Sequence, residues 1–402
     1  MSGFLRILFV GLVALVIGCG GSSSTAPQGV KVGITFVGFT PSVVATQIGT
    51  EPFMPASLID PNLLGLVLPN ATTNYAVAYV CPSGQQEFVL EANAQDFDKL
   101  AVNCPNVFQP PVAAAATGSV NASAIPGATQ VIVANALSPV SLGVSGSFSA
   151  LLPSGTRDIG FLAENASGVV LGVKILRSQT VPGAVNGGAT VVFAPTDTTT
   201  QQPIIIGNVP SGSAFGLTVA YDTIGGAGLL LNGSTNSYSA VPATETQGTD
   251  VYFYQSTATV TGSEVVGVLE ATTSGGGPVT LTLPVPWSFS GPAPAALPTF
   301  TFNYSGFAGL PAVSQEAAIA WTTPTSVSNS IMVTATANFQ NGATTLTFPD
   351  LTSLGGFLSA PSGAQISWSA QISGGTAQVF DIALPGSQSV GVVQNKGTYT
   401  QP

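Results

Sequence analysis

Histidine, the side chain that most often serves as a general base or a metal ligand, does not occur in this sequence of 402 residues. A Ser-His-Asp triad and a histidine-ligated zinc site are therefore excluded. Two close carboxylate pairs, Glu87 with Glu91 and Asp96 with Asp98, could in principle do acid–base work on a glycosidic bond. Neither pair stands in a supporting motif, so we expect solvated loop acids and no catalytic site, metal or cofactor.

Aromatic side chains offer a second kind of chemistry, because their faces can stack on sugar rings. The candidates are Tyr252 and Tyr254, which share one face of an expected strand, and the tryptophans Trp287, Trp321 and Trp368. Core packing is the expected role, since Trp and Tyr are usually largely buried. Ligand stacking by these five residues is the alternative.

The first 19 residues have the pattern of an exported chain. Arg6 precedes an apolar run from Ile7 to Ile17, and Gly18 and Cys19 follow. A positive charge, a short apolar run and a small residue before a break are typical of a secretory signal peptide. The run is too short to span a bilayer comfortably, which takes about 20 residues. Its last four residues, Val16-Ile17-Gly18-Cys19, resemble the lipobox of bacterial lipoproteins.

The lipobox resemblance implies a lipid anchor. In that family the peptide is cut before the cysteine, which then carries a diacylglycerol and a third acyl chain such as palmitate. Residues 1–18 would be the signal peptide, and residues 19–28 a lipidated Cys19 with a flexible Gly/Ser-rich tether. The membrane would be a partner through this lipid. The implied location is the bacterial cell envelope: the outer membrane where two membranes exist, because Gly20 follows the cysteine, and otherwise the cell surface. An ordinary signal peptide or a short N-terminal anchor is the alternative.

Cys81 and Cys104 are the two cysteines that remain after lipidation of Cys19. In an exported protein such an even pair indicates a disulfide. Closing a loop of about 22 residues should stabilise the fold by roughly 3 kcal/mol. Two independent buried thiols are the alternative.

Composition favours an all-β protein and excludes one class of partner. Hydrophobic residues make up 45% and charged residues only 6%, with 47 Gly and 30 Pro. Gly and Pro favour turns, and frequent Val, Ile, Leu and Phe argue against disorder. With 7 basic and 17 acidic residues, the net charge is −10. Nucleic acid is therefore not an expected partner, because binding its phosphates needs clustered Lys and Arg.

Strand-like runs bounded by Gly, Pro, Ser or Asn fill the mature chain and indicate tandem β-sandwiches. One short helical turn is expected at Ala92–Leu100. Linker-like segments divide the chain into a disulfide-containing β-domain and three β-sandwich domains, with the boundaries 29–111, 117–195, 204–289 and 299–402.

A strand, a turn that begins with Pro and a second strand recur along the chain. The turns are Pro69-Asn70, Pro153-Ser154-Gly155, Pro210-Ser211-Gly212 and Pro361-Ser362-Gly363. This pattern resembles transthyretin-like and other Ig-like bacterial surface domains, and the resemblance implies a β-sandwich fold. We expect a non-enzymatic, lipid-anchored structural, adhesion or binding protein, with a glycan or a protein as its ligand. A carbohydrate-binding or carbohydrate-active envelope protein is the alternative.

Overall fold

The structure is a computed structural model, and it describes residues 29–105, 112–138, 140–234, 236–260, 264–273, 275–307, 311–376 and 388–402. Within these ranges the chain is nearly all β, which confirms the predicted fold class. Its helical elements there are α1 (Ala337–Gln340) and the 3-10 turns η1 (Val185–Gly188), η2 (Pro195–Asp197) and η3 (Thr352–Leu354). Cys19 and its tether lie outside the described residues.

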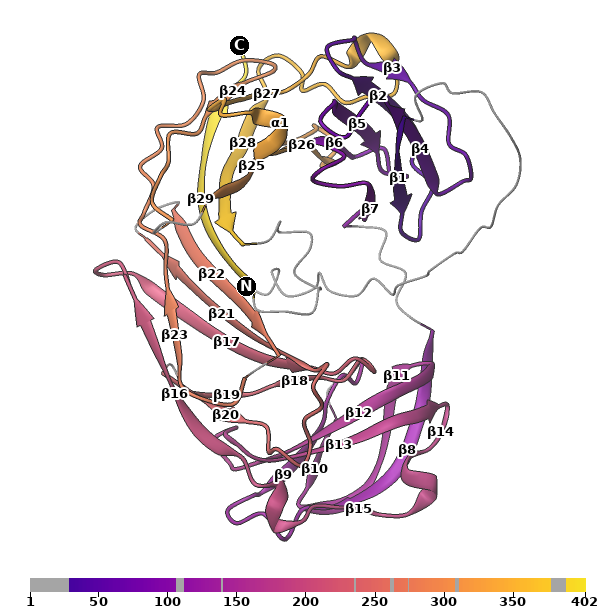
Figure 1. Ribbon diagram of the computed structural model, residues 1–402, viewed down its shortest axis with the longest axis vertical. Helices are drawn as coiled ribbons and strands as arrows, with labels where there is room; N and C mark the ends of the chain where they lie inside the picture. Colours follow the sequence, from indigo (N-terminus) through magenta and orange to yellow (C-terminus); the bar gives the residue numbers. More distant parts are fainter. Residues whose placement is uncertain are drawn as a thin grey trace.

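A twelve-stranded sheet is the spine of the molecule, and Figure 1 shows its central strands following one another along a curve. Neighbouring strands are antiparallel except for β26 and β6, which pair in parallel. In sheet order the strands are β18 (Gly228–Leu230), β17 (Ala214–Asp222), β21 (Val251–Thr259), β22 (Val265–Thr272), β29 (Gln388–Thr400), β28 (Gln365–Gly375), β25 (Ala312–Thr322), β26 (Ser328–Thr336), β6 (Gln86–Asn93), β5 (Asn74–Val80), β2 (Val43–Ile48) and β3 (Met54–Pro55).

One face of this sheet is apolar because its strands alternate with the period of two that a half-buried strand requires. In β21, Tyr252, Tyr254, Ser256 and Ala258 are buried, while the residues that alternate with them are more exposed. Register carries the same face across the sheet, since Tyr254 pairs with Val219 of β17. The main hydrophobic core therefore follows one face of the sheet over most of its width.

Two smaller sheets cover this face. One has the order β19 (Asn232–Ser234), β20 (Ser237–Ala240), β16 (Thr200–Gly207) and β23 (Val279–Thr282). The other is the two-stranded sheet of β24 (Thr299–Thr301) and β27 (Thr345–Thr347). Their inward residues, among them Tyr238, Leu281, Phe300 and Leu346, belong to the main core.

The N-terminal unit, β1 to β7, closes one end of the large sheet. Its own sheet has the order β4 (Leu63–Leu68), β1 (Val30–Phe36) and β7 (Lys99–Val102). This sheet packs on β5 and β6 through a separate core that includes Phe36, Leu64, Tyr75 and Tyr79. Two layers of sheet thus enclose the core, as in a sandwich.

The second unit, β8 to β15, is a sandwich at the other end of the molecule (Figure 1). One sheet has the order β10 (Val140–Gly143), β9 (Gln130–Val133), β12 (Gly155–Glu164) and β13 (Val170–Val181). The other contains β11 (Ser145–Pro153), β8 (Ala113–Asn121) and β14 (Gly183–Ala184), with β15 (Val191–Val192) also paired to β8. Phe148 and Phe161 meet between these sheets.

Strand pairing crosses two boundaries that composition predicted. β22 pairs with β29 across the expected break between 204–289 and 299–402. β26 pairs with β6, which lies in 29–111. These three stretches therefore contribute to one sheet rather than to three separate sandwiches. The stretch predicted as 117–195 is a sandwich of its own, and its first strand begins at Ala113.

The segment Ala92–Leu100, where a short helical turn is expected, contains no assigned helix but one hydrogen-bonded turn, in which Asp96 and Phe97 each donate an N–H to the carbonyl of Asn93 at 3.1 Å. Asn93 ends β6, and its side-chain oxygen accepts the backbone N–H groups of Gln95 and Asp96 at 3.0 and 3.2 Å. Such an Asx turn offers the backbone an alternative to a helix. The chain then enters β7 directly.

Candidate functional site

The predicted disulfide between Cys81 and Cys104 is confirmed. Cys81 follows β5 and Cys104 lies just beyond β7, with 5.9 Å between their Cα atoms. Both cysteines are buried in the core of the N-terminal unit. Because β5 belongs to the large sheet and β7 to the smaller one, the bridge fastens the two layers together.

Tyr252 and Tyr254 share one face of β21, as predicted, but that face is the core. They are 2% and 1% exposed, and Tyr238 packs edge-on against both rings. The hydroxyl of Tyr254 donates to that of Tyr238 at 3.0 Å, and the hydroxyl of Tyr252 accepts the N–H of Val241 at 2.9 Å. Burial raises the pKa of both tyrosines. Neither ring has a free face for a sugar.

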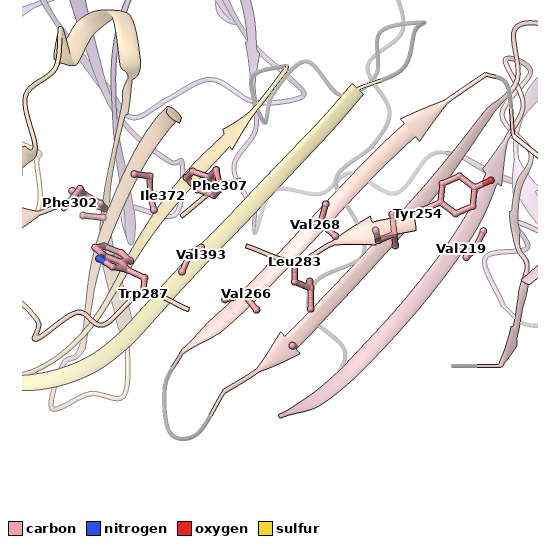
Figure 2. Packing of buried hydrophobic residues seen from close by; sticks show 14 of the residues in the cluster. Val219, Tyr254, Val266, Val268, Leu283, Trp287, Phe302, Phe307, Ile372 and Val393 are labelled. Carbon is pink, nitrogen blue, oxygen red and sulfur yellow. The ribbon is translucent and has the colours of Figure 1, made fainter. Parts of the chain in front are cut away.

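The tryptophans are packed in a similar way. Trp287 and Trp321 are 4% and 3% exposed. The indole of Trp287 lies 4.6 Å from the ring of Phe289. It lies 5.5 Å from the ring of Phe302, and Figure 2 shows these two side chains together. Both residues thus have the expected role in core packing, and the alternative of sugar stacking does not apply to them, because their apolar ring faces build the core.

Trp368 is half-buried, and its position depends on two glycines. Its ring packs edge-on against Phe289 at 5.4 Å. A Cβ atom at Gly397, its cross-strand partner, would lie 2.4 Å from the indole, and one at Gly291 would lie 2.7 Å from it. Gly291 also has a φ of +82°, a backbone conformation that glycine adopts without strain. Local sequence patterns gave no sign of this arrangement.

The carboxylate pairs are structural contacts between distant parts of the chain. Glu87 is 2% exposed and accepts the N–H of Leu358 at 2.7 Å. Burial raises its pKa to about 7, against an opposing effect of that hydrogen bond. Burial likewise raises the pKa of Glu91 to about 7. Glu87 and Glu91 are four positions apart in β6, which places them roughly 13 Å from each other along the strand. That distance is larger than the separation of the two catalytic carboxyl groups in a glycosidase.

Asp96 also links distant segments. Its two carboxylate oxygens accept from the hydroxyl of Thr336 at 2.5 Å and from the amide of Asn338 at 2.6 Å. These partners lie at the end of β26 and in α1. The carboxylate thus fastens the turn after β6 to the strand beside it. In the described part of the chain, no cluster of three or more acids and cysteines is placed to hold a metal ion.

A network of charges that the sequence analysis missed joins the second unit to the large sheet. Arg177 of β13 lies 2.9 Å from a carboxylate oxygen of Asp158 and 2.7 Å from one of Asp250. The hydroxyl of Tyr221 donates to Asp250 at 2.6 Å. Lys174 precedes Arg177 by three residues in β13, and its ammonium group lies 2.8 Å from a carboxylate oxygen of Glu245.

The network shifts the pKa values of its carboxyl groups in opposite directions. Burial alone would raise the pKa of Asp158, but hydrogen bonds from Ser178, Thr223 and Arg177 outweigh it and lower the pKa. Burial raises the pKa of Glu245, against the opposing effect of Lys174. Asp158, Glu245 and Asp250 therefore form ion pairs at this junction with Lys174 and Arg177. The whole chain has only 7 lysines and arginines. The spacing of these residues in sequence gave no signal of the contact.

A surface groove lies over the aromatic cluster around Trp287. Its volume is about 450 Å³. The segment from Trp287 to Ala293 forms one wall, and the exposed side chains of Thr299, Thr301 and Asn303 form the other. Its lining side chains carry hydroxyl, amide and apolar groups, and none of them is ionisable. This groove is the candidate binding site.

Comparison with known proteins gives no family. No protein-family model and no curated protein matches the chain. Among solved structures, the Bacillus anthracis TIE protein is similar over 63% of this chain, at 10% identity and a TM-score of 0.16. The chain spans about half of that protein, with 50% covered. The FN1–FN3 domains of chicken CNTN1 are similar over 82% of this chain and 94% of their own length, at 11% identity and a TM-score of 0.16.

Within the described ranges, no helix is long and apolar enough to cross a membrane.

Proposed function

We propose that this protein is a lipid-anchored protein of the bacterial cell envelope, acting as a non-enzymatic binding or adhesion module. The observation that carries the proposal is the lipobox-like sequence Val16-Ile17-Gly18-Cys19 at the end of a short apolar run. Two or more acyl chains make membrane attachment stable, because each buried methylene contributes about 0.8 kcal/mol. Gly20 after the cysteine favours the outer membrane in a cell that has two.

The architecture supports the binding part of the proposal. The disulfide suits a chain that folds outside the reducing cytosol. One wall of the groove carries β24, and Asn395 of β29 donates to the carbonyl of Trp287 at 2.7 Å, which ties the other wall to the large sheet. Sites carried on rigid elements hold their geometry better than sites on loops. Carbohydrate binding is the second candidate, but the burial of Tyr252, Tyr254 and Trp287 removes the stacking surface that suggested it.

Fatty-acid labelling tests the anchor. Cells that express the parent chain incorporate a clickable palmitate analogue into it, and the protein fractionates with membranes. Cys19→Ser abolishes the label and releases the protein, because the thiol that carries the diacylglycerol is gone. Cys104→Ser is the matched control, since it removes a cysteine outside the lipobox and should keep the label. Label retained on Cys19→Ser contradicts the proposal.

A further inference from the structure

Two extended segments face each other across the groove. In the first, Trp287 and Phe289 point into the core while Ser288 and Ser290 are exposed. In the second, which contains β24, the inward residues are Phe300 and Phe302, with the exposed residues Thr299, Thr301 and Asn303 between and beside them. Both segments therefore have the alternation of a β-strand.

The inward rings fix how the two segments are aligned. Trp287 stacks on Phe302 with 5.5 Å between ring centroids, and Phe289 stacks on Phe300 at 6.2 Å. The two segments therefore run antiparallel to each other. At one end the segments join, because the N–H of Val285 donates to the carbonyl of Gly306 at 3.2 Å.

Backbone groups of β24 point into the groove. Phe302 donates its N–H to the carbonyl of Thr344 at 2.6 Å, and Phe300 lies opposite Leu346 in the same register. In an antiparallel strand, successive residues direct their N–H and C=O groups to opposite edges. The N–H and C=O of Thr301 therefore point away from β27 and toward the groove.

The facing segment is anchored through the backbone of Trp287. A carboxylate oxygen of Glu264 accepts the N–H of Trp287, and Asn395 donates to the carbonyl of Trp287 at 2.7 Å. Both backbone polar groups of Trp287 are therefore used to hold this wall against the residues before and within the large sheet. In the described part of the chain, no backbone hydrogen bond joins the residues 287–293 to the residues 299–303.

We propose that this groove binds an extended, uncharged peptide segment of a partner protein as an added β-strand. Exposed strand edges with unpaired N–H and C=O groups are templates for a further strand, and here the free edge of β24 faces the groove. At roughly 3.4 Å per residue, the walls accommodate about four or five residues. The neutral lining matches a segment without charged side chains. The inference deepens the proposed binding function and rests on it.

A pair of substitutions at one position separates backbone from side-chain recognition. The probe is a display library of random decapeptides, selected on the purified full-length protein in detergent. Enriched peptides are expected to lose binding to Thr301→Pro by about tenfold or more, because proline removes the N–H that faces the groove. Thr301→Val keeps that N–H and should change the affinity by less than about twofold. The ladder to β27 does not use the N–H of Thr301, so both variants should fold as the parent does.

The peptide itself supplies a test that leaves the protein unchanged. Copies of an enriched peptide with N-methyl groups at alternate positions lose donors on one strand edge, so they should bind at least about tenfold more weakly. The inference is overturned if no peptides are enriched on the parent protein relative to Thr301→Pro. It is also overturned if the N-methylated copies bind as tightly as the unmodified peptide. Loss of binding in Thr301→Val together with binding of neutral oligosaccharides also overturns it, since that result indicates recognition of hydroxyl groups by side chains. Labelling of Cys19 with fatty acid is independent of all these outcomes.

Discussion

The N-terminal unit and the second unit lie at opposite ends of the large sheet and are attached to it by different chemistry (Figure 1). The N-terminal unit contributes β6, β5, β2 and β3 to the sheet itself, and a disulfide ties its second layer to β5. In the described residues, the second unit shares no strand with that sheet. It is held by apolar packing of residues such as Leu162 and Val173 into the main core and by a backbone hydrogen bond from Asp158 to Gly225. The charged part of this junction is Arg177 between Asp158 and Asp250.

This difference shows how a chain with few charges uses them. Strand pairing and a covalent bridge need no charge, so the N-terminal attachment is built from apolar and backbone groups. A junction without shared strands needs directional contacts between side chains, and bidentate Arg–carboxylate pairs supply them. The cations Lys174 and Arg177 are therefore concentrated at the junction that lacks strand pairing.

Removal of Arg177 should have the largest effect. Arg177→Met leaves the carboxylates of Asp158 and Asp250 without their cation in a largely buried site, and unfolding should become easier by roughly 3–5 kcal/mol. Urea denaturation of the full-length protein measures the change. Lys396→Met is the control, because it removes an exposed cation outside the network. Equal stability of the two variants would show that the network does not hold the junction.

Removal of the disulfide should have the next largest effect, confined to the other end of the molecule. Cys81→Ala with Cys104→Ala should destabilise the N-terminal unit by about 3 kcal/mol, since the unfolded chain gains the freedom of an open loop. The second unit should be unaffected. Thiol titration of the denatured parent without reductant checks the bridge in solution, and two free thiols per chain would contradict it.

A smaller effect should follow pH through Glu87. Its pKa is raised from 4.5 to about 7 in the folded protein, so the folded state holds the proton more tightly than the unfolded chain. The resulting stability is fully present below about pH 4.5 and is lost as pH rises through about 7. Thermal denaturation across this range should show the loss in the parent and in the control Glu51→Gln. A Glu87→Gln variant with the same pH dependence would rule out this role of Glu87.

The sequence predicted the parts of the fold that depend on local patterns. Alternation placed Tyr252 and Tyr254 on one face of a strand, and two nearby cysteines in an exported chain indicated a bridge. Alternation does not say which face of a sheet is covered, so the same pattern suggested a ligand surface where the structure has a core. The structure shows that this face of β21 is covered, because Tyr238 of β20 packs against Tyr254.

Contacts between distant segments were beyond such patterns. β26 pairs with β6 across most of the chain, and Arg177 meets Asp250 from another unit. No periodicity in either segment specifies its partner, because the pairing depends on how the whole chain closes. The groove was missed for the same reason: Trp287 and Phe289 lie at the end of the predicted domain 204–289, and residues 299–303 at the start of the next.

Hydrogen–deuterium exchange of the full-length protein tests the central claim, that the two units are held by different chemistry. The account predicts faster exchange in β1, β4 and β7 when Cys81 and Cys104 are replaced, with no change in β12 and β13. It predicts the reverse for Arg177→Met, with faster exchange in β12, β13 and residues 241–250 and no change in the N-terminal unit. Faster exchange in both units from either variant would contradict the account.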